Sequence, residues 1–273
     1  MARVNWSEEE TLAAFALYMM LEPKERDDKN PDVMGLAEGI GRSANAVSLK
    51  LWNIGAHDER RLALGKKGLG HTSKKDAEVW ERFNAEGDSF LDKALAVLVD
   101  YVGDNRQGVK TAEVLDLVYQ PPEGKAVITY ATHRVNQDYF RNTLLDSYSS
   151  RCCLTGISIP QLLVASHIKP WAVSDPKTER LDPSNGLLLN ALHDRAFDKG
   201  LITVKQDRMG DLRVCVSPRV KRGTDAVQMP DSTSGFDAGW LWSFNGTSIE
   251  LPLHHAPSKA YLEYHQEIIF LSA

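Results

Sequence analysis

The sequence predicts an α+β protein with a helical N-terminal part and a C-terminal part built on a strand–loop–strand–helix unit. Apolar residues recur at helical spacing in the N-terminal half, whereas residues 162–199 combine two short apolar runs with one short helical stretch. The content of 42% hydrophobic and 25% charged residues is typical of a folded globular chain. Its 273 residues allow two domains of ordinary size.

We expect three segments along the chain. Residues 1–75 form a helical domain, and residues 76–130 form a helical connector that ends in a linker. Residues 131–273 form the second domain, with its core at 150–202 and a C-terminal tail. The linker is clearest at 120–125, because Pro-Pro and Gly interrupt both helix and strand there.

The first helix has a recognisable N-terminal signal. Ser7 and Glu10 have the spacing of a capping box, in which each side chain bonds the backbone of the other residue. One apolar face follows on this helix. A second helix is expected over 33–40 and a third from Ser43 to about Asn53. The residues of the apolar face are Leu12, Ala13, Phe15, Ala16 and Met19.

The second and third helices have the spacing of a helix-turn-helix. Ala37 is small enough for a helix contact, Gly41 allows the turn, and Val47 is apolar on the following helix. In this motif the second helix enters the major groove of DNA. The alternatives are a purely structural bundle and a dimerisation surface, since this part of the chain is acidic. The predicted nucleic-acid-binding residues are Asn45, Ser48 and Lys50.

The strand–loop–strand–helix unit is predicted in more detail. Residues 162–168 form a strand that must stop at Pro170, because proline cannot extend a ladder. The sequence Asp-Pro-Ser-Asn-Gly at 182–186 is a turn, and residues 187–190 form the second strand. Residues 191–199 form a short helix, ended by a glycine.

Three polar residues occupy key places in this unit. His167 lies at the end of the first strand, Asn185 lies in the turn, and His193 lies in the first turn of the helix. An imidazole that titrates near neutral pH can take a proton from water. A second imidazole can hold a cation, and an amide can brace a loop by bonding its backbone. The order His, Asn, His therefore suggests a metal-dependent nuclease site.

This order, with Phe-Asp-x-Gly after it, resembles the HNH endonucleases, whose site is a ββα-metal finger. The likeness is greatest to the branch found in bacterial restriction-type nucleases. It extends over roughly residues 130–271, about half of the chain. The further segments that resemble the family are 134–141 before the finger, 152–156 at its start, and 246–252 and 265–270 in the tail.

The resemblance implies a metal-dependent DNA endonuclease of restriction or phage-defence type. It implies that His167 is the general base, Asn185 the bracing residue and His193 a ligand of one divalent metal ion, Mg²⁺ or Mn²⁺. The implied products carry a 5′-phosphate and a 3′-hydroxyl. The implied partner is double-stranded DNA. The oligomeric state stays open, with a homodimer as one option because one site cuts one strand.

One position departs from the family pattern. Ser166 stands where many HNH enzymes carry Asp or His, and a hydroxyl is a poor ligand for a hard cation. The second ligand stays open among Ser166, Asp194 and Asp198, although Asp198 lies five residues after His193 and would point elsewhere on a regular helix. Two alternatives follow: a DNA-binding protein with a degenerate HNH site, or a homing or recombination nuclease.

Cysteine content and hydropathy indicate whether the chain binds a structural zinc ion and in which compartment it is expected. The three cysteines, Cys152, Cys153 and Cys215, form no paired motif, so no structural zinc is expected. An odd cysteine number fits the reducing cytoplasm. No apolar run approaches the ~18 residues of a membrane span, and the N-terminus lacks an apolar signal core.

The charge distribution favours the second domain as the part that contacts DNA. The net charge is −5, but residues 132–223 hold 14 Lys and Arg against 9 Asp and Glu, a balance of +5. The segments on either side, 1–131 and 224–273, each have a balance of −5. The excess of positive charge, densest over 213–222, therefore lies in the segment that carries the His–Asn–His motif.

Overall fold

The computed structural model describes residues 5–63, 65, 72–103, 105, 107–119, 127–220 and 239–272. The predicted linker at 120–125 and the end of the basic run at 213–222 lie outside these residues. The chain divides into two compact units. The first unit extends to Thr143 and includes Pro176–Leu181, and the second contains Leu144–Asp175 and the chain from Asp182 onward. The three-segment division expected from the sequence stays a prediction.

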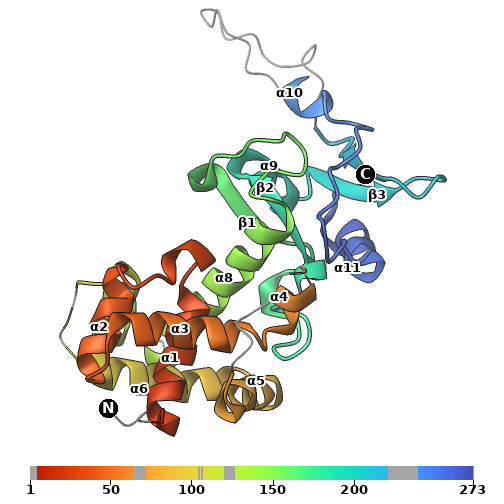
Figure 1. Ribbon diagram of the computed structural model, residues 1–273. Helices are drawn as coiled ribbons and strands as arrows, with labels where there is room; N and C mark the ends of the chain where they lie inside the picture. Colours follow the sequence, from red (N-terminus) through yellow and green to blue (C-terminus); the bar gives the residue numbers. More distant parts are fainter. Residues whose placement is uncertain are drawn as a thin grey trace, which may run out of the picture. The chain divides into compact units, whose positions relative to one another are not determined.

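The first unit is helical (Figure 1). A short 3-10 turn, η1 (Pro23–Glu25), follows the first helix, and α8 belongs to this unit as far as Thr143. The helices are α1 (Glu8–Met20), α2 (Pro31–Gly39), α3 (Ala44–Gly55), α4 (Glu59–Ala63), α5 (Lys74–Glu86), α6 (Asp88–Val102), α7 (Val109–Tyr119) and α8 (Val127–Ser147).

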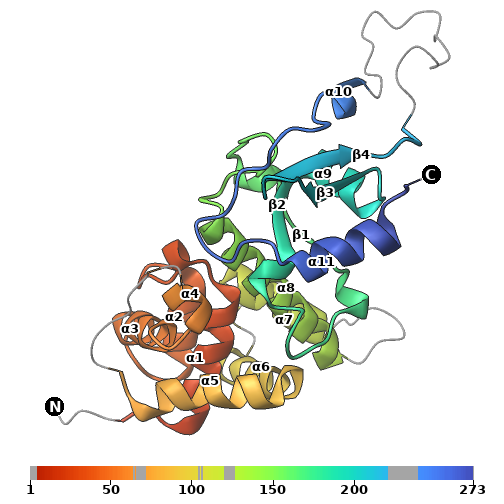
Figure 2. The ribbon, with the colours of Figure 1, turned by 90° about the vertical axis from the view of Figure 1, so that its right-hand side faces the viewer.

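Helix α1 is the centre of this unit. The predicted capping box is present: Ser7 Oγ accepts from the Glu10 backbone N–H at 2.9 Å, and Glu10 Oε2 accepts from the Ser7 N–H at 2.7 Å. Every residue from Thr11 to Met20 is buried, so the helix is covered all round rather than on one apolar face. Figure 2 shows α3, α5 and α6 beside it, and the Phe15 ring lies 5.0 Å from that of Trp80.

Helices α2 and α3 pack together as expected at Ala37 and Val47, which are both buried. Gly41 has φ +67°, the left-handed conformation that glycine adopts at little cost. Buried polar bonds join other parts of the unit. The Asp58 carboxylate accepts from the hydroxyls of Tyr18 and Tyr139, each at 2.8 Å. The helix-turn-helix function of α2 and α3 stays a prediction.

The second unit contains the predicted strand–loop–strand–helix. Strands β1 (Leu163–His167) and β2 (Gly186–Asn190) pair antiparallel, with His167 opposite Gly186. Helix α9 (Ala191–Asp198) follows β2 directly, so the predicted bounds of both strands and the helix are confirmed to within two residues. The connection between the strands contains two 3-10 turns, η3 (Trp171–Val173) and η4 (Pro183–Asn185).

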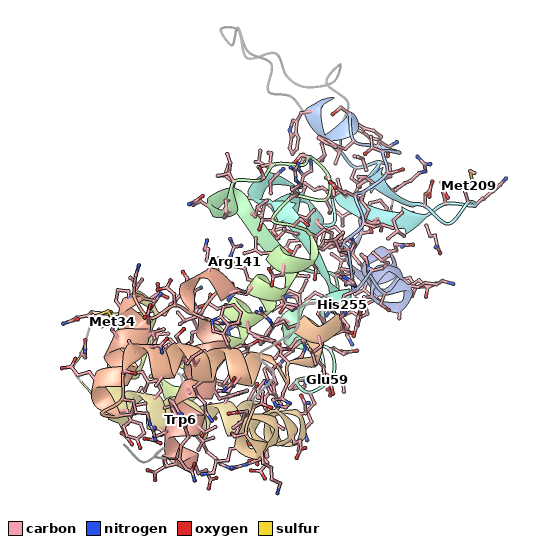
Figure 3. The ribbon with its side chains drawn as sticks, viewed as in Figure 1. Trp6, Met34, Glu59, Arg141, Met209 and His255 are labelled. Atoms are coloured by element: carbon pink, nitrogen blue, oxygen red, sulfur yellow. The ribbon has the colours of Figure 1, made fainter. Side chains whose placement is uncertain are left out.

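The rest of the second unit packs around this core. A second antiparallel pair, β3 (Ile202–Gln206) and β4 (Leu212–Val216), forms a hairpin whose turn carries the exposed Met209 (Figure 3). The C-terminal tail contains α10, then α11 and a π-helical turn. The tail elements are α10 (Gly239–Trp242), α11 (Lys259–Tyr264) and η5 (His265–Ile269), and a further 3-10 turn, η2 (Pro160–Leu162), precedes β1.

The tail is fastened next to the end of α9. Gly200 has φ +66°, and a Cβ there would lie 2.1 Å from the Ile269 carbonyl oxygen, so only glycine fits. The Leu271 N–H donates to the Gly200 carbonyl at 3.0 Å. The α+β prediction is therefore confirmed in its coarse form: a helix-rich chain with two small antiparallel sheets. None of the described helices is long and apolar enough to cross a membrane.

Candidate active site

A cavity of about 430 Å³ lies between the end of β1 and one face of α9. Strand β1 contributes Ser166 and His167 to its wall, and η3 contributes Trp171. Helix α9 contributes Asp194 and Asp198, together with two basic residues. The cavity therefore gathers an imidazole and two carboxylates from the segment that sequence analysis singled out.

His167 reaches this cavity because it is the last residue of β1, after which Pro170 ends the ladder. Its ring is half-buried and meets the Trp171 ring edge to face, with the ring centroids 5.4 Å apart and the planes at 90°. This contact restricts the rotation of the imidazole while the ring still faces the cavity. The geometry is what a positioned general base requires.

Asn185 is fully buried and bonds the backbone just after His167. Its Oδ1 accepts from the Lys169 N–H at 2.8 Å, and its Nδ2 donates to the Lys169 carbonyl at 3.2 Å and to Ser174 Oγ at 3.3 Å. The Asn185 carbonyl accepts from the Ile168 N–H at 2.9 Å. This one residue thus holds the chain that leaves β1, which is the geometry expected of a bracing residue.

The structure places His193 elsewhere. It does not line the cavity, and its ring packs edge to face against Phe244 and Trp240, at 4.5 Å and 5.3 Å between centroids. Successive residues of a helix point about 100° apart, so His193 turns away from the face that carries Asp194. His167 therefore lines this cavity and His193 does not, and their joint role in one site stays a prediction.

Hydrogen bonds also determine the protonation of the His193 ring. The Asn190 Oδ1 accepts from the N–H groups of Leu192 and His193, each at 3.1 Å, so the Asn190 Nδ2 is the group that donates to His193 Nδ1 at 2.8 Å. The ring proton is then on Nε2, which is buried and has no hydrogen-bond partner among the described residues. Burial also lowers the pKa of His193. Nε2 is therefore the nitrogen of this ring that no described residue contacts, and the role of His193 as a metal ligand stays a prediction.

Two carboxylates, both candidates for the second metal ligand, line the cavity. Burial raises the pKa of Asp194, and Asp198 adds to the rise, while the hydroxyl of Ser166 and the charge of Arg195 oppose it. Burial likewise raises the pKa of Asp198. These two residues are four apart, so both face the cavity, whereas His193 does not line it, as expected from the five-residue spacing between His193 and Asp198.

The donor set fits a hard divalent cation. Such cations prefer carboxylate oxygens, and a cation would relieve the repulsion between Asp194 and Asp198 that raises the pKa of Asp194. Ser166 Oγ is buried and close enough to the Asp194 carboxylate to lower its pKa, so a third oxygen lies beside the pair. No group of three or more His, Cys, Asp or Glu side chains is already arranged for a metal in the described part of the chain.

The cysteines lie apart from this donor set. Cys152 and Cys153 are buried, and Cys215 is partly exposed. The Cys152 Sγ accepts from the Asn190 N–H at 3.2 Å. The residue that orients His193 therefore also ties the start of the finger to the end of β2.

The predicted DNA-reading residues of α3 differ in solvent exposure. Asn45 is exposed, but Ser48 is buried and its Oγ donates to the Arg26 carbonyl at 2.6 Å. Lys50 is 2% exposed, forms an ion pair with Asp76, and lies 5.1 Å from the centroid of the Trp6 ring, which is labelled in Figure 3. The predictions for Ser48 and Lys50 are therefore wrong, because both side chains face the helical core instead of a groove of DNA.

Sequence reasoning missed the basic residues of the cavity. Arg195 and Lys199 line its α9 wall beside the two carboxylates. Their four-residue spacing, parallel to that of Asp194 and Asp198, was the available signal. The role of Asn190 as the N-cap of α9 was also missed, although an Asn directly before a helix start is a common cap.

A short ββα unit with an imidazole and two carboxylates around one cavity is typical of metal-dependent hydrolases. Residues 152–205 match a family model described as HNH endonuclease. The chain therefore carries an HNH endonuclease domain in its C-terminal half, and the match includes β1, β2, α9 and most of β3. In the comparison with curated proteins, none matches the chain.

Proposed function

We propose that this chain is a metal-dependent DNA endonuclease of restriction or phage-defence type. One observation carries the proposal: His167 and the carboxylates of Asp194 and Asp198 line the same cavity within the segment that matches the HNH endonucleases. An imidazole and a carboxylate pair are the groups that phosphodiester hydrolysis requires.

His167 is the general base in this proposal. Its neutral imidazole takes a proton from water, which then attacks the phosphorus atom. Asn185 keeps the imidazole in place by bonding the backbone of Lys169. A divalent ion, Mg²⁺ or Mn²⁺, held by Asp194 with Asp198 beside it, would supply charge to the phosphoryl and leaving oxygens. The products carry a 5′-phosphate and a 3′-hydroxyl.

A second candidate is a DNA-binding protein with a degenerate site. Two observations favour it: Ser166 replaces the acid or histidine found in many HNH enzymes, and His193 lies outside the cavity. The two candidates differ in cleavage, because only the first hydrolyses DNA when Mg²⁺ or Mn²⁺ is present.

The test is cleavage of supercoiled plasmid, with and without modified cytosines, in Mg²⁺ and in Mn²⁺. The parent protein is expected to nick the plasmid, and His167→Ala is expected to be at least about 100-fold slower, the usual contribution of a general base. His254→Ala, an exposed histidine outside the cavity, is the control and is expected to cleave like the parent.

Two outcomes contradict the proposal in different ways. If His167→Ala cleaves as fast as the parent, His167 is not the base. If the parent binds DNA and cleaves none of these substrates with either metal, the degenerate-site candidate is preferred.

A further inference from the structure

Helix α9 presents two kinds of charge to the cavity. Asp194 and Asp198 form one row along the helix, and Arg195 and Lys199 form a second row beside it. Members of each row are four residues apart and lie one above the other. The cavity wall therefore carries a strip of negative charge next to a strip of positive charge.

Arg195 and Lys199 are the two cations of this wall. Both side chains are exposed, and neither Arg195 nor Lys199 forms an ion pair within the described part of the chain. Arg213, by contrast, pairs with Asp207 at 2.6 Å and with Asp211 at 3.2 Å. Arg195 and Lys199 are near enough to the carboxylates to oppose the rise in the pKa of Asp198 without being bound to it.

A DNA backbone meets an electrostatic difficulty at this site. The scissile phosphate must approach Asp194 and Asp198, whose negative charges repel it. Successive phosphates of one strand are only several ångströms apart, so a neighbouring phosphate also lies close to α9. A cation row next to the carboxylate row offsets this repulsion, and the guanidinium of an arginine can bind a phosphate through two parallel hydrogen bonds.

We propose that Arg195 and Lys199 bind the phosphate next to the scissile one and so position the DNA strand against His167. This inference rests on the proposed nuclease function and adds the residues that hold its substrate. The carboxylate row serves the metal ion, and the cation row serves the backbone. The contact is to phosphate alone, so it is independent of base sequence.

The experiment measures binding of a fluorescently labelled DNA duplex to the full chain in EDTA, over a range of salt concentrations. Each lost phosphate contact is expected to reduce the slope of log K against log[salt] by about 0.9. Arg195→Gln and Lys199→Gln are each expected to show this loss and weaker binding at low salt. The control is Arg208→Gln, an exposed arginine in the β3–β4 turn that does not line the cavity, whose slope is expected to equal that of the parent.

A conservative variant separates charge from geometry. Arg195→Lys keeps the charge and is expected to keep the salt slope, while its plasmid nicking with Mg²⁺ falls because the two-bond contact is lost. Thermal unfolding of each variant checks that the fold is intact. We expect it to be, because the substituted side chains are exposed.

Failure of this inference is distinct from failure of the proposed function. If the parent binds and cleaves DNA while both glutamine variants keep the parent slope, the cation row does not contact DNA and the inference is overturned. If the parent neither binds nor cleaves DNA, the nuclease proposal itself fails, and this inference falls with it.

Discussion

At the scale of single residues, the adjacent residues His193 and Asp194 of α9 show how two side chains one position apart on a helix face different surroundings. His193 is buried against Trp240 and Phe244, and Asn190 occupies its Nδ1. Asp194 faces the cavity with His167. We therefore propose Asp194 in place of His193 as the metal ligand.

Metal binding distinguishes these two residues. Asp194→Asn is expected to weaken Mn²⁺ binding by at least about tenfold, because even groups behind the ligands contribute that much at metal sites. His193→Phe is expected to leave Mn²⁺ affinity unchanged, since the new ring keeps the aromatic contacts. Calorimetric titration of the full chain measures both. Loss of binding in His193→Phe together with normal binding in Asp194→Asn would restore the histidine as the ligand.

At the scale of elements, the C-terminal π-helical turn holds α9 in place through His265. The His265 ring stacks on Phe197 with the centroids 3.7 Å apart. Its Nε2–H donates to the Phe197 carbonyl at 3.1 Å, and its Nδ1 accepts from the Thr203 hydroxyl at 2.9 Å. Both nitrogens of the neutral ring are used, so a proton on Nδ1 would reverse the bond to Thr203, whose hydroxyl would have to accept instead of donate, and would place a charge in a buried site.

This histidine is expected to make stability depend on pH. Burial lowers the pKa of His265 from 6.5 to about 4. Below pH 6.5 the unfolded chain therefore binds a proton that the folded chain excludes, and stability falls as the pH drops from 6.5 towards 4. The loss is on the order of 3 kcal/mol over this window. Urea unfolding of the parent between pH 7.5 and 4.5 measures it.

The matched control for this effect is His265→Gln, which keeps a polar side chain without a titrating ring. The variant is expected to be less stable at neutral pH, and the difference in unfolding free energy between parent and variant is expected to shrink as the pH falls. A difference that stays constant from pH 7.5 to pH 4.5 contradicts the role given to His265.

At the scale of the whole molecule, one chain offers one cavity with the nuclease groups among its described residues. Cleavage of both strands by a site that cuts one strand requires two encounters or two chains. A homodimer on DNA is our proposal for the second case. The basic balance of +5 over residues 132–223 lies in the part that would contact the backbone.

The order of plasmid products tests this proposal. Nicked circles are expected first, and linear DNA is expected to rise more steeply than the protein concentration. Mixing the parent with His167→Ala is expected to suppress linear product more than nicking, because mixed dimers cut only one strand. Linear product that follows nicking in proportion at every concentration, from a chain that sediments as a monomer on DNA, would exclude the dimer.

The sequence by itself determined what depends on neighbours along the chain. The capping box at Ser7 and Glu10, the end of β1 at His167, and the strand–loop–strand–helix order follow from local spacing and from proline and glycine. The match to the HNH endonucleases lies in the same segment. The bracing contacts of Asn185 were also expected, because a turn asparagine has few other partners than the backbone of its own loop.

Only the tertiary structure decided which side of each helix meets the core. Lys50 and Ser48 were expected to face DNA, but α3 turns them towards α5 and the segment before α2. His193 and Asp194 have different surroundings because aromatic side chains of the C-terminal tail pack against His193, whereas Asp194 lines the cavity. These outcomes depend on contacts between residues far apart in the chain, and local spacing carries no information about which partner fills which face.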